Sequence, residues 1–190
     1  MELKLSKKPK GVTIVEGFPG MALIGTISTE YLMEHLEFEP IGKIIFDDAP
    51  AVVAIHEGNL IEPLGIYYNK KSNMVVIHGL NLMYGNEWEL SKIILELFKK
   101  LEAKEIISIE GVGAPEQEVN EGVPDGSVFF YSNNTNTIKR MQKLNISKLQ
   151  DGIIMGITSA LMVKSEKHPS HASLPKCIPS FLTQKLLLQS

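Results

Sequence analysis

The stretch from Val12 to Leu32, VTIVEGFPGMALIGTISTEYL, constrains the fold more than any other part of the chain. An apolar run stops at Glu16 and Gly17, the chain turns through Phe18-Pro19-Gly20, and apolar and small residues then recur at helical spacing. This order predicts a strand, a tight turn and a helix. Such a unit opens a parallel α/β fold, in which ligands and partners meet the chain at the carboxyl ends of strands.

Further strands and helices alternate along the rest of the chain. The apolar patterns predict strands at 41–46, 74–78, 105–110 and 128–131, a hairpin within 51–68, and helices near 86–101, 135–144 and 152–163. A polar stretch at 111–126 separates two of the strands and has the length of a functional loop. We therefore predict an α/β fold, a three-layer sandwich in which helices cover both faces of a mostly parallel sheet.

Composition limits the class of protein. The chain has 190 residues, 44% of them hydrophobic, which suffices for a single α/β domain that we place at 1–169. With a net charge of -3, the chain lacks the excess of basic residues typical of nucleic-acid-binding proteins, so we expect no nucleic-acid partner.

The longest apolar stretch, 152–163, is too short to cross a bilayer, and the N-terminus lacks the apolar core of a signal peptide. We expect a cytoplasmic protein without a membrane partner, and the one cysteine fits a reducing compartment.

Three predicted strands end in a polar residue followed by glycine. The polar residues are Glu16, His78 and Glu110, and they share one edge of the sheet if their strands are parallel neighbours. Two carboxyl groups and an imidazole at one edge are suited to acid-base catalysis. The alternative is that each side chain bonds to nearby backbone or loop groups. Because no nucleophile or set of metal ligands accompanies them, the pattern favours this second interpretation.

No cofactor or metal is expected. The Gly17–Gly20 turn lacks the spacing of a phosphate-binding loop, Pro19 offers no N–H group, and no lysine follows. His168, His171 and Cys177 do not match the spacing of a zinc site. Phe18, at the tip of the turn, is either packed over the helix or offered to a partner.

Four segments together resemble the proteasome assembly chaperone family, specifically the archaeal relatives of its second member. The segments are VEGFPGMALIGTISTEYL, ISIEGVG, VFFYSNNTNTIKRM and DGIIMGITSALMV, and the resemblance extends over residues 11–165. It implies an α/β sandwich related to nucleoside phosphorylase and peptidyl hydrolase folds. It also implies self-association into a homo-oligomer and binding to proteasome α subunits.

The C-terminal segment 170–190 departs from this family. Some members end in a hydrophobic residue, a tyrosine and any residue, whereas this chain ends in Leu188-Gln189-Ser190. Residues 181–190 can be encoded by codons that, read one base earlier, give LPDSKAAATK, which resembles the usual segment of the family. We interpret 170–190 as an atypical tail in a truncated or altered C-terminal part, produced by a shift of reading frame near Pro169. The nucleotide sequence tests this hypothesis.

Two functions follow from these observations. The first is a non-catalytic, chaperone-like protein that self-associates and binds proteasome α subunits, with contacts at Gly17, Phe18, Pro19, Gly20, Gly111 and Gly113. The alternative is a small-molecule enzyme, a ligase related to the ATP-grasp enzymes, a phosphorylase or a hydrolase, that uses Glu16, His78 and Glu110. If these three side chains converge in a deep pocket, the enzyme is favoured. If each forms hydrogen bonds with nearby groups of the chain, the binding protein is favoured.

Overall fold

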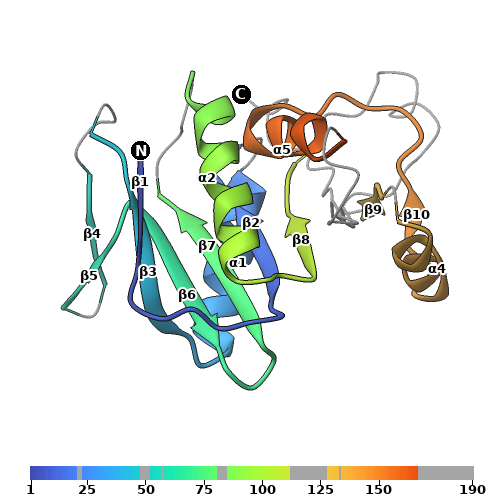
Figure 1. Ribbon diagram of the computed structural model, residues 1–190. Helices are drawn as coiled ribbons and strands as arrows, with labels where there is room; N and C mark the ends of the chain where they lie inside the picture. Colours follow the sequence, from blue (N-terminus) through green and yellow to red (C-terminus); the bar gives the residue numbers. More distant parts are fainter. Residues whose placement is uncertain are drawn as a thin grey trace, which may run out of the picture.

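A six-stranded sheet forms the centre of the computed structural model (Figure 1). The structure describes residues 1–20, 23–47, 52–56, 58–80, 85–111, 128–132 and 134–166. In spatial order the strands are β1 (Glu2–Leu5), β3 (Glu39–Ile45), β6 (Leu64–Asn69), β7 (Met74–Gly79), β2 (Thr13–Gly17) and β8 (Glu105–Ser108).

The sheet is mixed, which corrects the prediction of a mostly parallel one. Strand β2 runs parallel to both β7 and β8, but β1, β3, β6 and β7 pair antiparallel with one another in turn. The short turn at 70–73 explains part of this, because so few residues can only reverse the chain and a parallel pairing needs a long crossover. Asn69 stabilises the turn, as its Oδ1 accepts hydrogen bonds from the Ser72 N–H and hydroxyl at 2.8 Å.

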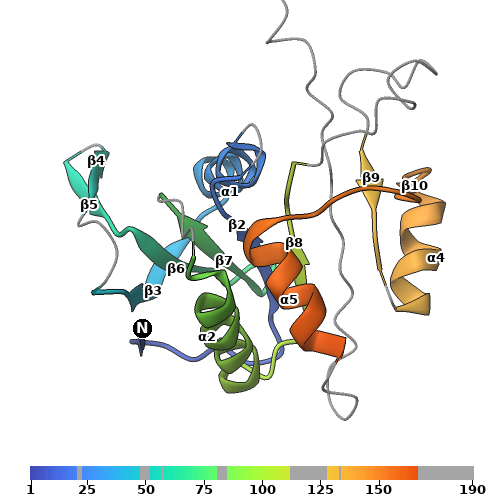
Figure 2. The ribbon, with the colours of Figure 1, turned by 90° about the horizontal axis from the view of Figure 1, so that it is seen from above.

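Helices cover both faces of the sheet, so the predicted three-layer α/β class is confirmed. Helix α1 (Ile24–His35) lies on one face, and α2 (Glu87–Lys100) and α5 (Gly156–Glu166) lie on the other (Figure 2). Beyond β8 lie helix α4 (Thr135–Lys143) and a small parallel pair, β9 (Phe129–Phe130) and β10 (Ser147–Lys148). A separate hairpin consists of β4 (Ala54–His56) and β5 (Asn59–Ile61).

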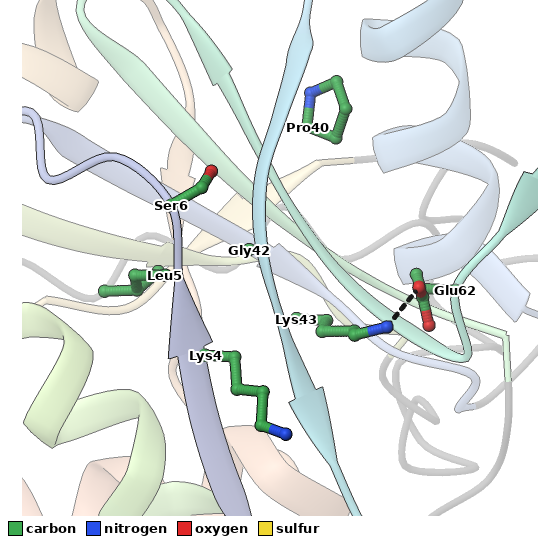
Figure 3. Close-up of a pocket in the computed structure, with 7 residues that line it drawn as sticks. All are labelled: Lys4, Leu5, Ser6, Pro40, Gly42, Lys43 and Glu62. Carbon is green, nitrogen blue, oxygen red and sulfur yellow. Dashed lines mark hydrogen bonds and ion pairs between the residues drawn. The ribbon is translucent and has the colours of Figure 1, made fainter.

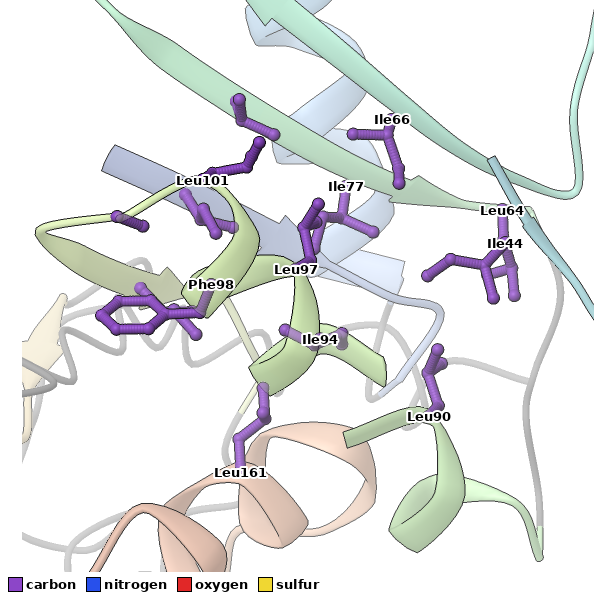
Figure 4. Close-up of a cluster of buried hydrophobic side chains, with 14 of the residues drawn as sticks. Ile44, Leu64, Ile66, Ile77, Leu90, Ile94, Leu97, Phe98, Leu101 and Leu161 are labelled. Carbon is purple, nitrogen blue, oxygen red and sulfur yellow. The ribbon is translucent and has the colours of Figure 1, made fainter. Parts of the chain in front are cut away.

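The central strands are buried on both faces, so their side chains enter two separate cores. Ile14 and Ile77 pack with α2 and α5 in the larger core (Figure 4), whereas Val15 and Val76 pack with α1 in the smaller one. This double burial explains why β2 and β7 contain nearly continuous apolar runs. It also fixes which way each residue at the end of these strands points, because successive side chains alternate between the faces.

Several expected features lie outside the described residues. They are most of the 111–126 loop and the tail 170–190. The hypothesis of a shifted reading frame concerns this tail, so the structure does not test it. Strand β1 was not expected, because Leu3 and Leu5 alternate with charged residues in a run too short for a clear strand pattern. In the part of the chain that the structure describes, no helix has both the length and the apolar character needed to span a bilayer.

Candidate functional site

Glu16 is a fully buried carboxyl group at the end of β2. Its side chain is 1% exposed and points to the face covered by α2 and α5, where Oε1 accepts a hydrogen bond from the Thr158 hydroxyl of α5 at 3.2 Å. Its second oxygen, Oε2, has no hydrogen-bond partner among the described residues. A buried carboxylate with so few donors is costly, and the carboxyl group lowers that cost by keeping its proton.

The electrostatic surroundings of Glu16 favour its neutral form. Burial is the largest effect and raises the pKa of Glu16 to about 8, against an ordinary value of 4.5. The hydroxyl groups of Ser108 and Thr158 oppose this shift, while the negative charge of Glu110 adds to it. At neutral pH this side chain is therefore a carboxylic acid inside the protein.

Glu110 is the second carboxyl group at this edge, just after β8. It is buried, and its Oε1 accepts a hydrogen bond from the N–H of the next residue, Gly111, at 3.1 Å. It also lies directly against the turn after β2, because a Cβ atom on Gly20 would be 2.2 Å from the same oxygen. The lack of a side chain at Gly20 therefore leaves room for this carboxyl group beside the turn.

His78 lies at the same edge but on the opposite face of the sheet. It stands opposite Gly17 in the register of β7 and β2, and its Nδ1 lies 2.9 Å from the Thr29 hydroxyl of α1. Burial lowers the pKa of His78, and the nearby Glu30 partly opposes this shift. The sheet therefore separates His78 from the Glu16 carboxyl group. The three predicted residues share an edge, but they do not converge in one pocket.

The turn after β2 is held in place by glycine contacts and a buried aromatic ring. A Cβ atom on Gly17 would lie 2.2 Å from the carbonyl oxygen of Gly25 in α1, so the end of the strand touches the helix backbone. The Phe18 ring is buried and packs against Gly79. The ring is thus not exposed to a partner, but it lies in the larger core with α2 and α5 and does not pack over α1. Pro19 and Gly20 are partly exposed, Gly111 is buried, and Gly113 lies outside the described residues.

Three hydroxyl groups complete this edge and were not expected from the sequence. Thr29 contacts His78, while Ser108 and Thr158 both lie beside Glu16. Ser108 is opposite Glu16 in the register of β8 and β2, a relation that needs the strand pairing to be known. Thr158 is 142 residues away from Glu16 in the chain, so no local pattern identifies it.

A shallow depression of about 410 Å³ lies elsewhere, over β1 and β3 (Figure 3). Lys43 and Glu62 form an ion pair of 2.7 Å across part of its wall. None of the predicted site residues lines it; its lining residues are Lys4, Leu5, Ser6, Pro40, Gly42, Lys43 and Glu62. Within the described ranges, no three histidine, cysteine or acidic side chains gather in a way that would hold a metal ion.

Solved structures share this fold. The crystal structure of Pyrococcus furiosus PbaA, an archaeal homolog of proteasome-assembly chaperone, superimposes with a TM-score of 0.78 at 23% identity, covering 94% of this chain and 75% of that one. Pyrococcus furiosus PbaB, an archaeal proteasome activator, gives 0.73 at 16% identity, with coverages of 94% and 78%. A protein of unknown function from Thermoplasma acidophilum gives 0.73 at 20% identity, with coverages of 91% and 68%.

Sequence comparison identifies the family. No curated protein matches the chain, but the model of the PAC2 family matches residues 14–174, which include the β2–α1 turn, the end of β8 and all of α5. These are the regions whose motifs resemble the proteasome assembly chaperone family, and that resemblance is confirmed. The chain belongs to the PAC2 family.

Proposed function

We propose that this protein is a non-catalytic, proteasome-assembly-chaperone-like protein that self-associates and binds proteasome α subunits. Membership of the PAC2 family and a fold similar to that of an archaeal proteasome-assembly chaperone homolog support the chaperone-like role. The observation that carries the binding role is an apolar surface on α1 that no described part of the chain covers.

This surface, the α1 stripe, consists of Leu23, Ile27 and Tyr31. The residues are four apart, so they lie along one side of the helix, and they are 52%, 57% and 59% exposed. His35 extends the stripe, since its ring stacks on Tyr31 with 3.9 Å between centroids. The other side of α1 packs on the sheet through Ile24, Gly25 and Thr29. Contiguous apolar surface of this kind marks protein-protein contact sites.

The β4–β5 hairpin provides more apolar surface on the same side of the sheet as α1 (Figure 2). Val53, Ile55 and Leu60 are all more than half exposed there. Burying such side chains against another subunit gives affinity without any bond chemistry, which is what a chaperone of subunit assembly requires. We assign the α1 stripe to self-association.

The turn after β2 is the proposed contact with α subunits. Gly17 and Phe18 are buried and set its shape, so direct contact falls to the partly exposed Pro19 and Gly20. The N–H of Gly111 donates to the Glu110 carboxyl group, which in turn lies against Gly20 of the turn. Gly113 is proposed as a contact from the sequence alone. We further infer a cytoplasmic location, because a single cysteine fits a reducing compartment.

The enzyme alternative has weaker support. Acid-base catalysis by the three predicted residues needs the Glu16 carboxyl group and the His78 imidazole within reach of one substrate. Here the two side chains point to opposite faces, and each has a hydroxyl partner, Thr158 for Glu16 and Thr29 for His78. This arrangement matches the role of polar groups that tie helices to a sheet.

We expect the Ile27→Glu substitution to weaken self-association at least about tenfold. Burying an isoleucine is worth about 1.5–3 kcal/mol, and a carboxylate in its place must also be desolvated. Sedimentation velocity over a concentration series measures the change. Leu144→Glu, at an exposed apolar residue after α4, is the matched control and should associate like the wild type. Equal association by both variants would contradict the assignment of the α1 stripe.

Capture of α subunits tests the second half of the proposal. The full-length chain is immobilised and exposed to purified proteasome α subunits from the same source, beside the Ile27→Glu variant. We expect both to retain α subunits, because the turn after β2 is intact in each. Failure of the wild type to retain them would rule out the proposed partner, and loss in the variant alone would place the contact on the α1 stripe.

A further inference from the structure

Helix α5 packs mainly on α2, and one polar contact joins it to the sheet among the described residues. Ile157 and Leu161 of α5 belong to the larger core, where Leu161 lies next to Ile94 of α2 (Figure 4). The polar point is the hydrogen bond from Thr158 to Glu16, in which both partners are about 1% exposed. A polar contact at this depth is stable only while both groups are free of uncompensated charge.

Among the described residues, the surroundings of Glu16 supply no cation to balance a negative charge. On β7 the residue opposite it is Ile77, and on β8 it is Ser108. From α5 it faces Thr158, and the charged group that acts on it is the acidic Glu110. The nearest cation of α5 along the helix, Lys164, is engaged with α2, where it donates to the Ser91 hydroxyl at 2.8 Å and to the Trp88 carbonyl oxygen.

We propose that Glu16 is a proton-dependent lock for α5, which holds the helix on the sheet while its carboxyl group is protonated and favours release of the helix when it is ionised. Release of α5 uncovers the side of α2 that carries Ile94 and Phe98, and so enlarges the apolar surface of the protein. The lock is independent of the proposed function, because it depends only on contacts within this chain.

The direction of the pH effect follows from proton linkage. With α5 docked, the Glu16 pKa is about 8, but once the helix leaves, water reaches the carboxyl group and its pKa returns towards the ordinary 4.5. Between these two values the open form loses a proton that the docked form keeps. The equilibrium constant for opening therefore rises about tenfold per pH unit in this window and levels off above it.

Hydrogen exchange of the backbone amides of α5 measures this opening directly. The full-length wild type and its Glu16→Gln variant are compared from about pH 5.5 to about pH 7.5, after correction for the intrinsic exchange rate. Helix α1 is the internal control, since it packs on the other face of the sheet. We expect protection of α5 to fall about tenfold per pH unit in the wild type and to stay constant in the variant. Protection of α1 should exceed that of α5 at every pH, because α1 stays packed on the sheet when α5 leaves.

A second variant separates the effect of the hydrogen bond on the docking of α5 from the effect of the Glu16 proton. Thr158→Val removes the hydroxyl but leaves Glu16 in place, so α5 should open more at every pH with an unchanged dependence on pH. Circular dichroism verifies that both variants are folded. A pH-independent α5 in the wild type would overturn the proposal. So would the same pH dependence in Glu16→Gln, which would assign the proton to another group. Equal protection of α5 and α1 in the wild type would also overturn it, because the exchange would then come from global unfolding.

Discussion

Replacing Glu16 with glutamine is expected to abolish most of the pH dependence of global stability near neutrality. In the wild type the folded state keeps the Glu16 proton up to about pH 8, whereas the unfolded chain loses it near 4.5. The folded state thus binds more protons within this window, so its stability is highest below the window and falls as pH rises through it. Glu16 contributes a loss of at most about 1.4 kcal/mol per pH unit, or about 3.5 kcal/mol from about pH 5 to about pH 8.

Urea unfolding at several pH values tests this expectation, followed by the fluorescence of Trp88, the single tryptophan of the chain. The Glu16→Gln variant should lose this fall in stability. It should keep only the opposite effect of His78, whose lowered pKa makes stability rise with pH up to about the ordinary value of 6.5. Glu96→Gln is a suitable control, because Glu96 is a half-exposed surface residue paired with Lys100 at 2.7 Å. Its pH profile should match that of the wild type. Parallel profiles for the wild type and Glu16→Gln would show that Glu16 does not carry the linkage.

The second large effect is expected for Gly17→Ala. The added Cβ atom would lie 2.2 Å from the Gly25 carbonyl oxygen, 2.6 Å from the Gly25 carbonyl carbon and 2.8 Å from the Thr29 side chain. Two of these neighbours are backbone atoms of α1, so the whole helix must shift to relieve the contact. We expect a loss of about 3 kcal/mol of stability or more, as in an overpacked core.

Thermal and urea unfolding measure this loss. Thr13→Ala, on the same strand, provides the comparison, because its half-buried hydroxyl makes one long hydrogen bond to Glu105 at 3.3 Å. That variant should lose only about 1 kcal/mol or less. A Gly17→Ala protein as stable as Thr13→Ala would mean that α1 does not approach β2 as closely as the structure has it.

The sequence was sufficient to predict the elements that have a local cause. The apolar run of β2, the glycine turn and the helical spacing of α1 identify the first unit within a few residues. Helix α2 follows from its apolar periodicity, although Asn86 makes no side-chain hydrogen bond at its start. Placing Glu16, His78 and Glu110 at one edge needed two assumptions, that each lies at the end of a strand and that these strands are parallel neighbours.

The remaining features depend on relations between distant segments. Whether Glu16 and His78 point to the same face depends on the register of β2 and β7, in which His78 is level with Gly17. The antiparallel half of the sheet was missed because pairing direction is set by connections, and not by the strand residues themselves. The hydrogen bond from Thr158 to Glu16 joins two distant segments, and no local sequence pattern around either residue predicts this contact.

The mixed sheet also gives the chain an order of assembly. Strands β6 and β7 are joined by a turn of four residues, 70–73, whereas α5 reaches Glu16 across 142 residues. The entropy lost on closing a loop grows with its length, so the antiparallel pair forms at less cost than the docking of α5. During synthesis, β1, β2, β3, β6 and β7 are complete once residue 79 has emerged. The carboxyl group of Glu16 therefore stays at the edge of a partial sheet until α5 has been synthesised.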